Sequence, residues 1–477
     1  MQDKFHRRYD FSQPLDDVWE MIPENGWDFA MSPGRAHFTN TSASKAEIYL
    51  RPCSIYGDTI EFEFAPDAAR RGLFAFSFLS GFECITLELD LDSGDLRVLT
   101  HEHHKVQPRH AGKVPVDFTN LKIIREKDTL PGLPYEGSSI KILLDDRIVA
   151  SAGNIDFLPE CILMFGLHGA GEVTLASLTI SGPARPRPEY VNVGIWQQNI
   201  KPTTAENVNA LIEGVRQAAA AGVEILVTPE TSLIGLRPDH SDWTDKAHIQ
   251  AALREFQDAV SKIPNAPHTL IGYPDWIPGA EVEGAEVDEV IVNCHLFVKP
   301  DGTLGPRMAK VHVCEDGMWH GRDYNLQRVR GVEVAMGVCH DAHYTDVWAT
   351  GVMAGARLLL HPSSGGNLRG SIPRVVDGFR GLGTRYDSFW VNVNAGGGAA
   401  IVYPTSNRKQ PNTILAVPAD LTEASPTYPE YSPMGDLLAH ARLRLWDATG
   451  SYPMRTLRSG KQRYELWSSL IPEIQEV

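Results

Sequence analysis

The first 182 residues of the chain alternate apolar and polar positions with a period of two. The clearest runs are IEFEF at 60–64, ITLELDL at 85–91 and VTLASLTI at 173–180. This period is typical of half-buried antiparallel strands, and turn-forming clusters such as DLDSGD separate the runs. Many short strands at close spacing predict a β-sandwich of jelly-roll type over residues 1–182. A short helix is expected only at 15–22, LDDVWEMI.

A proline-rich segment, GPARPRPEY, ends this strand pattern. Proline removes a backbone donor and restricts the residue before it, so the segment is not expected to be helical. We place a linker at 183–190, between a β-sandwich accessory domain at 1–182 and a second domain at 191–477.

The second domain alternates strands with helices. The strand VNVGIWQQN leads into a helix whose start is marked by a capping box of Thr203 and Glu206. Further helices are predicted at about 245–262, 347–356 and 372–389. Alternating strands and helices indicate an α/β domain, in which helices cover a sheet. The first helix has an apolar stripe with helical spacing, formed by Val208, Leu211, Ile212 and Val215.

Three reactive side chains follow strand-like runs in this domain. Cys339 ends the apolar run VEVAMGVC, Glu230 ends EILVTPE, and Lys310 follows a predicted hairpin that turns at PDG. In α/β proteins, ligands bind at the carboxyl ends of strands. A thiol, a carboxylate and an ammonium at such ends suit a nucleophile, a base and an electrophilic stabiliser.

Each of these residues alone has a simpler interpretation. Cys339 could be a buried core cysteine, which is what we expect of Cys161 and Cys294 inside apolar strands. Glu230 could cap a turn, and Lys310 could be a solvated hairpin residue. Their order along one α/β domain favours the chemical interpretation.

The ordered set resembles the nitrilase superfamily of carbon–nitrogen hydrolases over about residues 190–467. The matching pieces are TPETSLIG around Glu230, VIVNCHLFVKPDGTLGPRMAKVH around Lys310 and VAMGVCHDAHYTDVWATGVMAGARLLLHPSS around Cys339, with YPDW, RYDSFWVNVNAGGG and RSGKQRYELW as weaker matches. The resemblance implies a four-layer αββα sandwich that forms dimers by stacking. It assigns Cys339 as nucleophile, Glu230 as general base and Lys310 as stabiliser of the transition state, without metal or organic cofactor.

The resemblance and proximity to these motifs suggest further site residues. Members of the superfamily have a second glutamate between the lysine and the cysteine, and we expect Glu315 to take this place, although its spacing from Lys310 is short. It would orient the substrate or support the lysine.

Backbone N–H groups after Cys339, that of His340 first, are expected to hold an oxyanion. Cys314 is expected to be a packing residue, with a place in the same pocket as Glu315 as the alternative. The substrate-binding residues are expected to be His340, His343, Trp319 and Asn394, with a core position as the alternative for Trp319.

The predicted function is hydrolysis of a non-peptide C–N bond in a small amide or carbamoyl-type substrate. A thioester would form on Cys339 with release of ammonia or an amine, and water activated by Glu230 would then release the acid. An amide is favoured over a nitrile because an acid follows two residues after the cysteine, whereas true nitrilases carry Cys-Trp-Glu there. The alternatives are nitrile hydrolysis to the acid, acyl transfer to an amine, and a binding module in which the β-sandwich carries the main role.

Composition narrows the partners. The formal net charge of −16 disfavours nucleic acids and anionic membranes, and no apolar run reaches the roughly 18 residues of a membrane span. The six cysteines are sparse and form no CxxC pair, which disfavours a disulfide framework or structural zinc and favours a reducing compartment. We therefore expect a cytoplasmic homodimer or larger homo-oligomer that binds a small amide or nitrile, and no nucleic acid, membrane, metal or cofactor.

Overall fold

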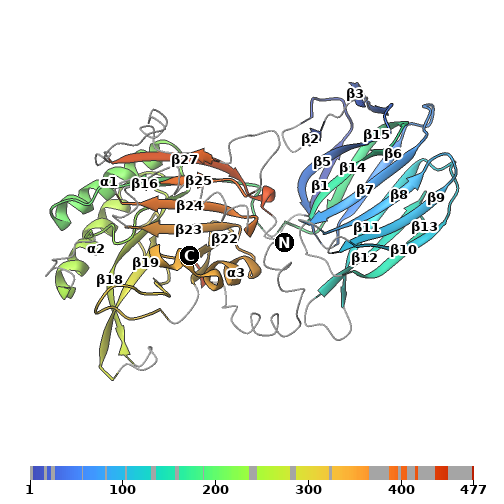
Figure 1. Cartoon of the computed structure of the whole chain (residues 1–477). Coiled ribbons are helices and arrows are strands. Elements are labelled where there is room, and N and C mark those ends of the chain that lie inside the picture. The colour runs from blue at the N-terminus through green and yellow to red at the C-terminus, as the bar shows by residue number, and fades with distance from the viewer. Residues whose placement is uncertain are drawn as a thin grey trace, which may run out of the picture. The chain divides into compact units, whose positions relative to one another are not determined.

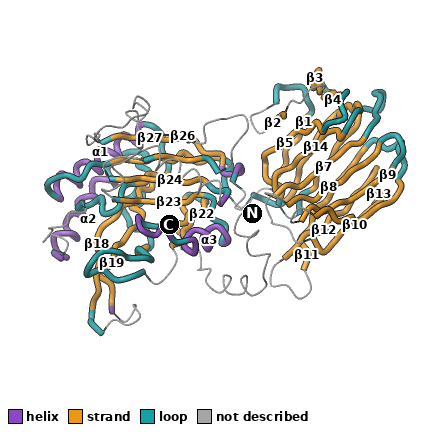
Figure 2. Tube along the Cα trace, viewed as in Figure 1, coloured by secondary structure: helices purple, strands orange, loops and turns teal. Residues whose placement is uncertain are grey.

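The computed structural model of the 477-residue chain divides into two compact units, Met1–Pro186 and Arg187–Val477. The described part of the first unit is built of strands, and the second unit combines strands with helices (Figure 1, Figure 2). The structure describes residues 4–15, 19–22, 27–55, 57–80, 83–102, 105–129, 136–155, 161–185, 187–235, 244–279, 286–321, 325–364, 386–395, 399–404, 414–416, 436–448 and 475–477.

The first unit is a sandwich of two antiparallel sheets. One sheet has the order β13 (Arg147–Ile155), β12 (Glu136–Leu144), β11 (Asn120–Thr129), β6 (Thr59–Phe64), β15 (Gly171–Gly182), β4 (Arg35–Asn40) and β3 (Trp27–Ser32), with β1 (Phe5–Tyr9) also paired to β15. The other has the order β10 (Lys105–Lys113), β9 (Asp95–Glu102), β8 (Glu83–Asp90), β7 (Leu73–Ser80), β14 (Cys161–His168), β5 (Lys45–Ser54) and β2 (Trp19–Ile22).

The core of this sandwich is formed by alternate residues of facing strands. Every second residue of β6 and β7 is a buried aromatic or aliphatic side chain that joins a single core cluster. The ring of Phe62 meets those of Phe74 and Phe165 edge-on, with centroids 5.4 and 5.2 Å apart. Edge-to-face pairs are a favourable geometry for aromatic rings. The jelly-roll-like β-sandwich predicted from the period of two is therefore confirmed.

The short helix expected at 15–22 is wrong. Residues Trp19–Ile22 form strand β2, which pairs with β5 so that Trp19 lies opposite Leu50. The indole of Trp19 is buried, with its ring 5.9 Å from that of Phe165. Burying a large aromatic ring on an edge strand outweighs the weak helical preference of so short a segment.

The second unit contains two mixed sheets, each with three parallel strands at its centre. The first has the order β20 (Met308–Ala309), β19 (Glu289–Val298), β18 (His268–Pro278), β17 (Ile225–Val227), β16 (Tyr190–Gln197) and β27 (Leu437–Arg444). The second has the order β26 (Ile414–Ala416), β25 (Ala400–Val402), β24 (Phe389–Asn394), β23 (Leu358–Ser363), β22 (Val332–Met336), β21 (Asn325–Val329) and β28 (Gln475–Glu476).

Helices cover the outer faces of these two sheets (Figure 1). α1 (Thr204–Ala220) and α2 (Lys246–Val260) share one apolar core with the first sheet, and α3 (Thr345–Met353) shares another with the second sheet. A third core, which includes Val193 of β16 and Val334 of β22, fills the space between the sheets. The predicted αββα sandwich is therefore confirmed.

The helices of the second unit follow their sequence signals closely. Thr203 and Glu206 form the predicted capping box at the start of α1. α2 and α3 lie within the helices expected at 245–262 and 347–356, apart from two residues at the start of α3. Most of the helix expected at 372–389 lies outside the described residues, as does the segment RSGKQRYELW. None of the described helices combines the length and hydrophobicity that crossing a bilayer requires.

Replacement of Gly214 by alanine is expected to destabilise the second unit. Gly214 lies on α1 against the indole of Trp196, and a Cβ there would come within 2.6–2.7 Å of three ring atoms. Such overpacking typically lowers the free energy of unfolding by about 1–3 kcal/mol. The higher helix propensity of alanine than of glycine offsets about 1 kcal/mol of this loss. Urea unfolding of Gly214→Ala should show the loss. Asn209→Ala, at an exposed position of the same helix, is the control and should be neutral or slightly stabilising. A more stable Gly214→Ala protein would contradict the close packing.

Candidate active site

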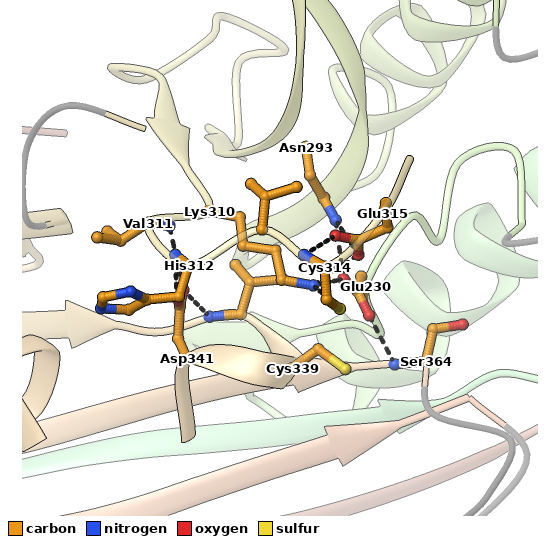
Figure 3. Close-up of polar contacts among 12 residues, drawn as sticks. Glu230, Asn293, Lys310, Val311, His312, Cys314, Glu315, Cys339, Asp341 and Ser364 are labelled. Carbon is orange, nitrogen blue, oxygen red and sulfur yellow. Dashed lines mark hydrogen bonds and ion pairs between the residues drawn. The ribbon is translucent and has the colours of Figure 1, made fainter. Parts of the chain in front are cut away.

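Loops at strand ends of both sheets carry the candidate site (Figure 3). Glu230 lies in the loop after β17, and Lys310 follows β20 directly. Cys339 lies after β22, where it begins the 3-10 helix η3 (Cys339–His343). The structure thus brings the thiol, the carboxylate and the ammonium singled out in the sequence to one place.

The ammonium of Lys310 is the centre of the polar network. Its side chain is fully buried, and Nζ donates to Glu230 Oε1 at 3.0 Å and to Glu315 Oε1 at 2.5 Å. Asn293 Nδ2 donates to the same two oxygens at 2.8 and 3.3 Å. A buried charge is tolerated when it is paired and hydrogen-bonded. Glu315 therefore lies where it can support the charge of Lys310.

The carboxylate of Glu230 joins the two sheets. Its Oε1 accepts from Lys310 and Asn293, which belong to the sheet that contains β19 and β20. Its Oε2 accepts from the backbone N–H of Ser364 at 3.0 Å, and Ser364 follows β23 of the other sheet. Both oxygens of this buried carboxylate are thereby oriented.

Cys339 has a strained backbone conformation at the start of η3. Its φ of 47° lies in the left-handed region, which costs a residue other than glycine roughly 1–2 kcal/mol. A strained turn from strand to helix presents a nucleophile in the same way in other hydrolases. The Ser363 hydroxyl and the Ser364 N–H act to lower the pKa of the Cys339 thiol. In Figure 3 its sulfur points toward Ser364 and Glu230.

The charges of the site set its protonation. Burial raises the pKa of Glu230, and the nearby Lys310 offsets only part of this effect. Burial would lower the pKa of Lys310, but the charges of Glu230, Cys339 and Glu315 together outweigh it, so the pKa lies above its usual range. Burial, and then the charge of Glu230, raise the pKa of Cys339 to about 12. The resting site therefore holds a charged lysine and a neutral thiol that needs a base.

Glu315 differs from Glu230 in its protonation. Burial alone would raise its pKa, but the Lys310 ammonium outweighs burial and holds the pKa of Glu315 below its usual range. Two carboxylates on one ammonium thus have their pKa values moved in opposite directions. Such a separation is how paired carboxylates come to take different roles.

Asp341 connects the two loops that carry Cys339 and Lys310. Its buried carboxylate accepts from the backbone N–H groups of Val338 at 2.8 Å, His312 at 2.7 Å and Val311 at 3.4 Å. Nothing in the sequence around Asp341 marks these contacts with distant backbone groups. The structure gives it a positioning role, because it holds the lysine loop against the cysteine turn.

The expected substrate-binding residues occupy different surroundings. His340 is half-buried, and its ring lies 5.3 Å from the ring of the exposed His343. Asn394 is buried at the end of β24 and lies opposite Ser363 of the neighbouring strand β23. Ser363 in turn acts on the Cys339 thiol, so Asn394 lies close to the site. Trp319 packs against the core beneath α1 and α2, and its N–H donates to Ile291 O at 2.8 Å. The structure therefore favours the core alternative for Trp319.

Four residues of the site differ from what the sequence suggested or were missed. Cys314 is an exposed thiol, with Sγ 3.9 Å from Lys310 Nζ, so the expectation of a packing residue is wrong. Asn293 was missed, although a polar residue inside the apolar strand VIVNCHLF is a usable signal. Ser363 and Ser364 were missed because nothing local marks them. Cys161 and Cys294 are buried core residues, as predicted.

Residues 192–373 match the family model of carbon–nitrogen hydrolases. The second unit carries a carbon–nitrogen hydrolase domain. Similar solved structures include a cysteine-to-alanine mutant of a Nesterenkonia AN1 amidase from the nitrilase superfamily, with 14% identity and a TM-score of 0.43 over 59% of this chain and 99% of that chain. Another is a glutamate-to-glutamine mutant of the amidase from Nesterenkonia sp. AN1, showing covalent addition of the acetamide moiety of fluoroacetamide at the active site cysteine. It has 14% identity and a TM-score of 0.44 over 59% of this chain and 98% of that chain. No curated protein matches the chain.

Residue roles in this carbon–nitrogen hydrolase domain are therefore argued from its own geometry. Among the described residues, no group of three or more His, Cys, Asp and Glu side chains is placed to hold a metal ion. What the site does bring together is a thiol, a buried carboxylate and a buried ammonium, which is a set suited to acyl transfer.

The alkylation of Cys339 is expected to keep accelerating with pH in the folded hydrolase domain. Only the thiolate reacts, and a thiol with a pKa of about 12 gains thiolate about tenfold per pH unit below that value. Iodoacetamide labelling from about pH 8 to about pH 10, followed by peptide mass spectrometry, measures the rate. The urea-unfolded chain is the control, since its cysteines should level off near the ordinary pKa of about 8.5. A plateau at that value in the folded protein would contradict the neutral resting thiol.

Proposed function

We propose that the carbon–nitrogen hydrolase domain hydrolyses a non-peptide C–N bond in a small amide or carbamoyl-type substrate through a thioester on Cys339. The observation that carries this proposal is the buried Lys310 ammonium, held between Glu230 and Glu315 beside the Cys339 thiol. Acyl transfer needs a nucleophile, a base and a cation near the developing oxyanion, and this set supplies all three.

The first half of the reaction forms the thioester. Glu230 takes the proton of the thiol while Sγ attacks the substrate carbonyl carbon, and the π electrons move to oxygen. Lys310 Nζ and the N–H of His340 stabilise that oxyanion. The C–N bond then breaks, the nitrogen takes the proton held by Glu230, and ammonia or an amine leaves.

The second half releases the acid. A water molecule gives a proton to Glu230 and attacks the thioester carbonyl, which again places negative charge on oxygen near Lys310. When the C–S bond breaks, the proton on Glu230 returns to Sγ and the carboxylic acid leaves. Glu230 therefore acts as base and acid in turn, whereas Glu315 keeps Lys310 charged and in place throughout.

An amide is favoured over a nitrile by the residue that follows the cysteine turn. Asp341 occupies the second position after Cys339, and its carboxylate is engaged by three backbone N–H groups. The chain carries His340 and Asp341 where nitrilases carry the Trp and Glu of Cys-Trp-Glu. Nitrile hydrolysis and acyl transfer to an amine are the alternatives.

A covalent acyl adduct on Cys339 is the expected signature of this mechanism. The chain is incubated with short aliphatic amides, N-carbamoyl amino acids and matching nitriles, and products and peptides are followed by mass spectrometry. Ammonia and acid should form from an amide or carbamoyl compound, with an adduct on Cys339 alone. Cys339→Ala should lose both activity and adduct. Cys314→Ala is the matched control and should keep an adduct on Cys339.

The other outcomes distinguish the alternatives. Acid formed from a nitrile but not from its amide would make the protein a nitrilase. A new amide formed only when an amine is added would make it an acyltransferase. Full biological activity in Cys339→Ala would favour a binding role of the β-sandwich and contradict the proposal.

Activity is expected to fall on acidification at a higher pH than for an ordinary glutamate. Glu230 must be ionised to accept a proton, and burial raises its pKa, so kcat/KM should decline as pH falls through a value above about 4.3. Glu230→Gln should lower kcat by at least about 10²- to 10⁴-fold. Glu213→Gln, at an exposed position of α1, should leave the profile unchanged. An acid limb at or below the ordinary value would contradict the role of Glu230.

We also propose that the chain acts in the cytoplasm as a homodimer or larger homo-oligomer. The resemblance to the nitrilase superfamily supports assembly, and the free state of the cysteines that the structure describes supports a reducing compartment. Light scattering of the purified chain tests the assembly, and a strictly monomeric, fully active protein would contradict it.

A further inference from the structure

We propose that His361 is a positioning residue for Cys339: its imidazole holds the backbone carbonyl of Cys339 and thereby fixes the turn that presents the thiol. The inference rests on the proposed function, in which Cys339 is the nucleophile. His361 is not part of the thiol–carboxylate–ammonium set, and its side chain meets Cys339 at the backbone carbonyl.

His361 is buried beneath the cysteine turn. It lies on β23, is 3% exposed, and its Nε2 is 3.0 Å from Cys339 O. Its Nδ1 is 2.7 Å from Oδ1 of Asn392, its direct neighbour on β24. The rings of Trp348 and Trp390 lie against it, with centroids 6.0 and 5.6 Å away. The imidazole is therefore held on four sides.

These partners select one tautomer of the imidazole. Burial lowers the pKa of His361, so the ring is neutral and carries one N–H. A carbonyl oxygen can only accept, and the proton that bridges His361 and Cys339 must lie on Nε2. Nδ1 then carries no proton and can only accept. Asn392 satisfies it when the carboxamide is turned by 180°, so that the NH₂ group takes the place of Oδ1 and donates to Nδ1. Asn392 thus aims the donor at the cysteine turn, as second partners of functional histidines commonly do.

The bond from His361 completes the support of a strained turn. Cys339 has a φ of 47°, which a residue with a Cβ does not adopt without help. On one side of it, the backbone N–H of Asp341 donates to the carbonyl of Val338 at 2.9 Å. On the other side, His361 donates to the carbonyl of Cys339 itself. Both peptide groups that flank the Cys339 Cα are therefore fixed, and with them the direction of Sγ toward Ser363 and Glu230.

The competing interpretation is that His361 only fills space and satisfies Asn392. Two substitutions separate these roles because their amides reach different places. In His361→Gln the side-chain NH₂ reaches the place of Nε2 and can donate to Cys339 O. In His361→Asn the amide reaches only the place of Nδ1, so Asn392 keeps a partner and the cysteine turn loses its donor.

The experiment measures kcat and KM of the two variants and of the unmutated full chain. The substrates are propionamide and the best amide of the panel described above. We expect His361→Asn to lower kcat by about 10- to 100-fold with KM changed little, as for a misplaced reacting group. His361→Gln should restore most of the loss. Urea unfolding gives the folded fraction of each variant, by which kcat is normalised. Cys339→Ala serves as the zero of activity.

The outcomes are separable from those of the proposed function. Equal normalised kcat in the Gln and Asn variants, or an effect confined to KM, would overturn the positioning role while leaving Cys339 as nucleophile. Activity retained in Cys339→Ala would instead overturn the proposed function. Normalised kcat that is low in His361→Asn and recovered in His361→Gln supports the inference.

Discussion

The buried ammonium of Lys310 is the interaction on which the rest of the site depends. An unpaired charge in the interior is costly, and removing one partner of a buried ion pair typically costs about 3–5 kcal/mol. Lys310 is satisfied only when Glu230 and Glu315 both reach it, and Asn293 bridges the same two carboxylate oxygens. The requirement to neutralise one lysine therefore fixes the relative positions of three loops, and the proposed chemistry would use the same charges that hold the site together.

The layered fold makes this possible by placing strand ends from two sheets together. Each sheet has three parallel strands at its centre, and parallel strands end at a common edge. The apolar core between the sheets keeps water from the strands, so the polar groups at their ends act on one another without strong screening. Asp341 then ties the lysine loop to the cysteine turn through backbone N–H groups, which any sequence of that loop would supply.

Sequence patterns predicted much of this architecture because the patterns are local. The period of two in the first unit and the capping box at Thr203 report how a segment meets its immediate surroundings, and both agree with the structure. Trp19 was misassigned because its partner is a strand about thirty residues away, which no short segment can indicate. Asn293, Ser363, Ser364 and His361 acquire their roles only from register and from contacts between distant strands. Cys314 was misjudged for the same reason, since exposure is a property of the folded surface.

The bonds of Glu230 have a consequence for how the protein opens. Because one carboxylate is held by residues of both sheets, the sheets cannot slide or separate without breaking the Glu230–Ser364 bond. Proteins commonly unfold in cooperative segments, and sites on low-stability segments lose order before the rest of the molecule. Here the amide of Ser364 reports on the sheet-to-sheet interface itself, so its hydrogen exchange would proceed through opening of the whole sandwich and not through local fraying. The order of the candidate site and the integrity of the central interface are then lost together.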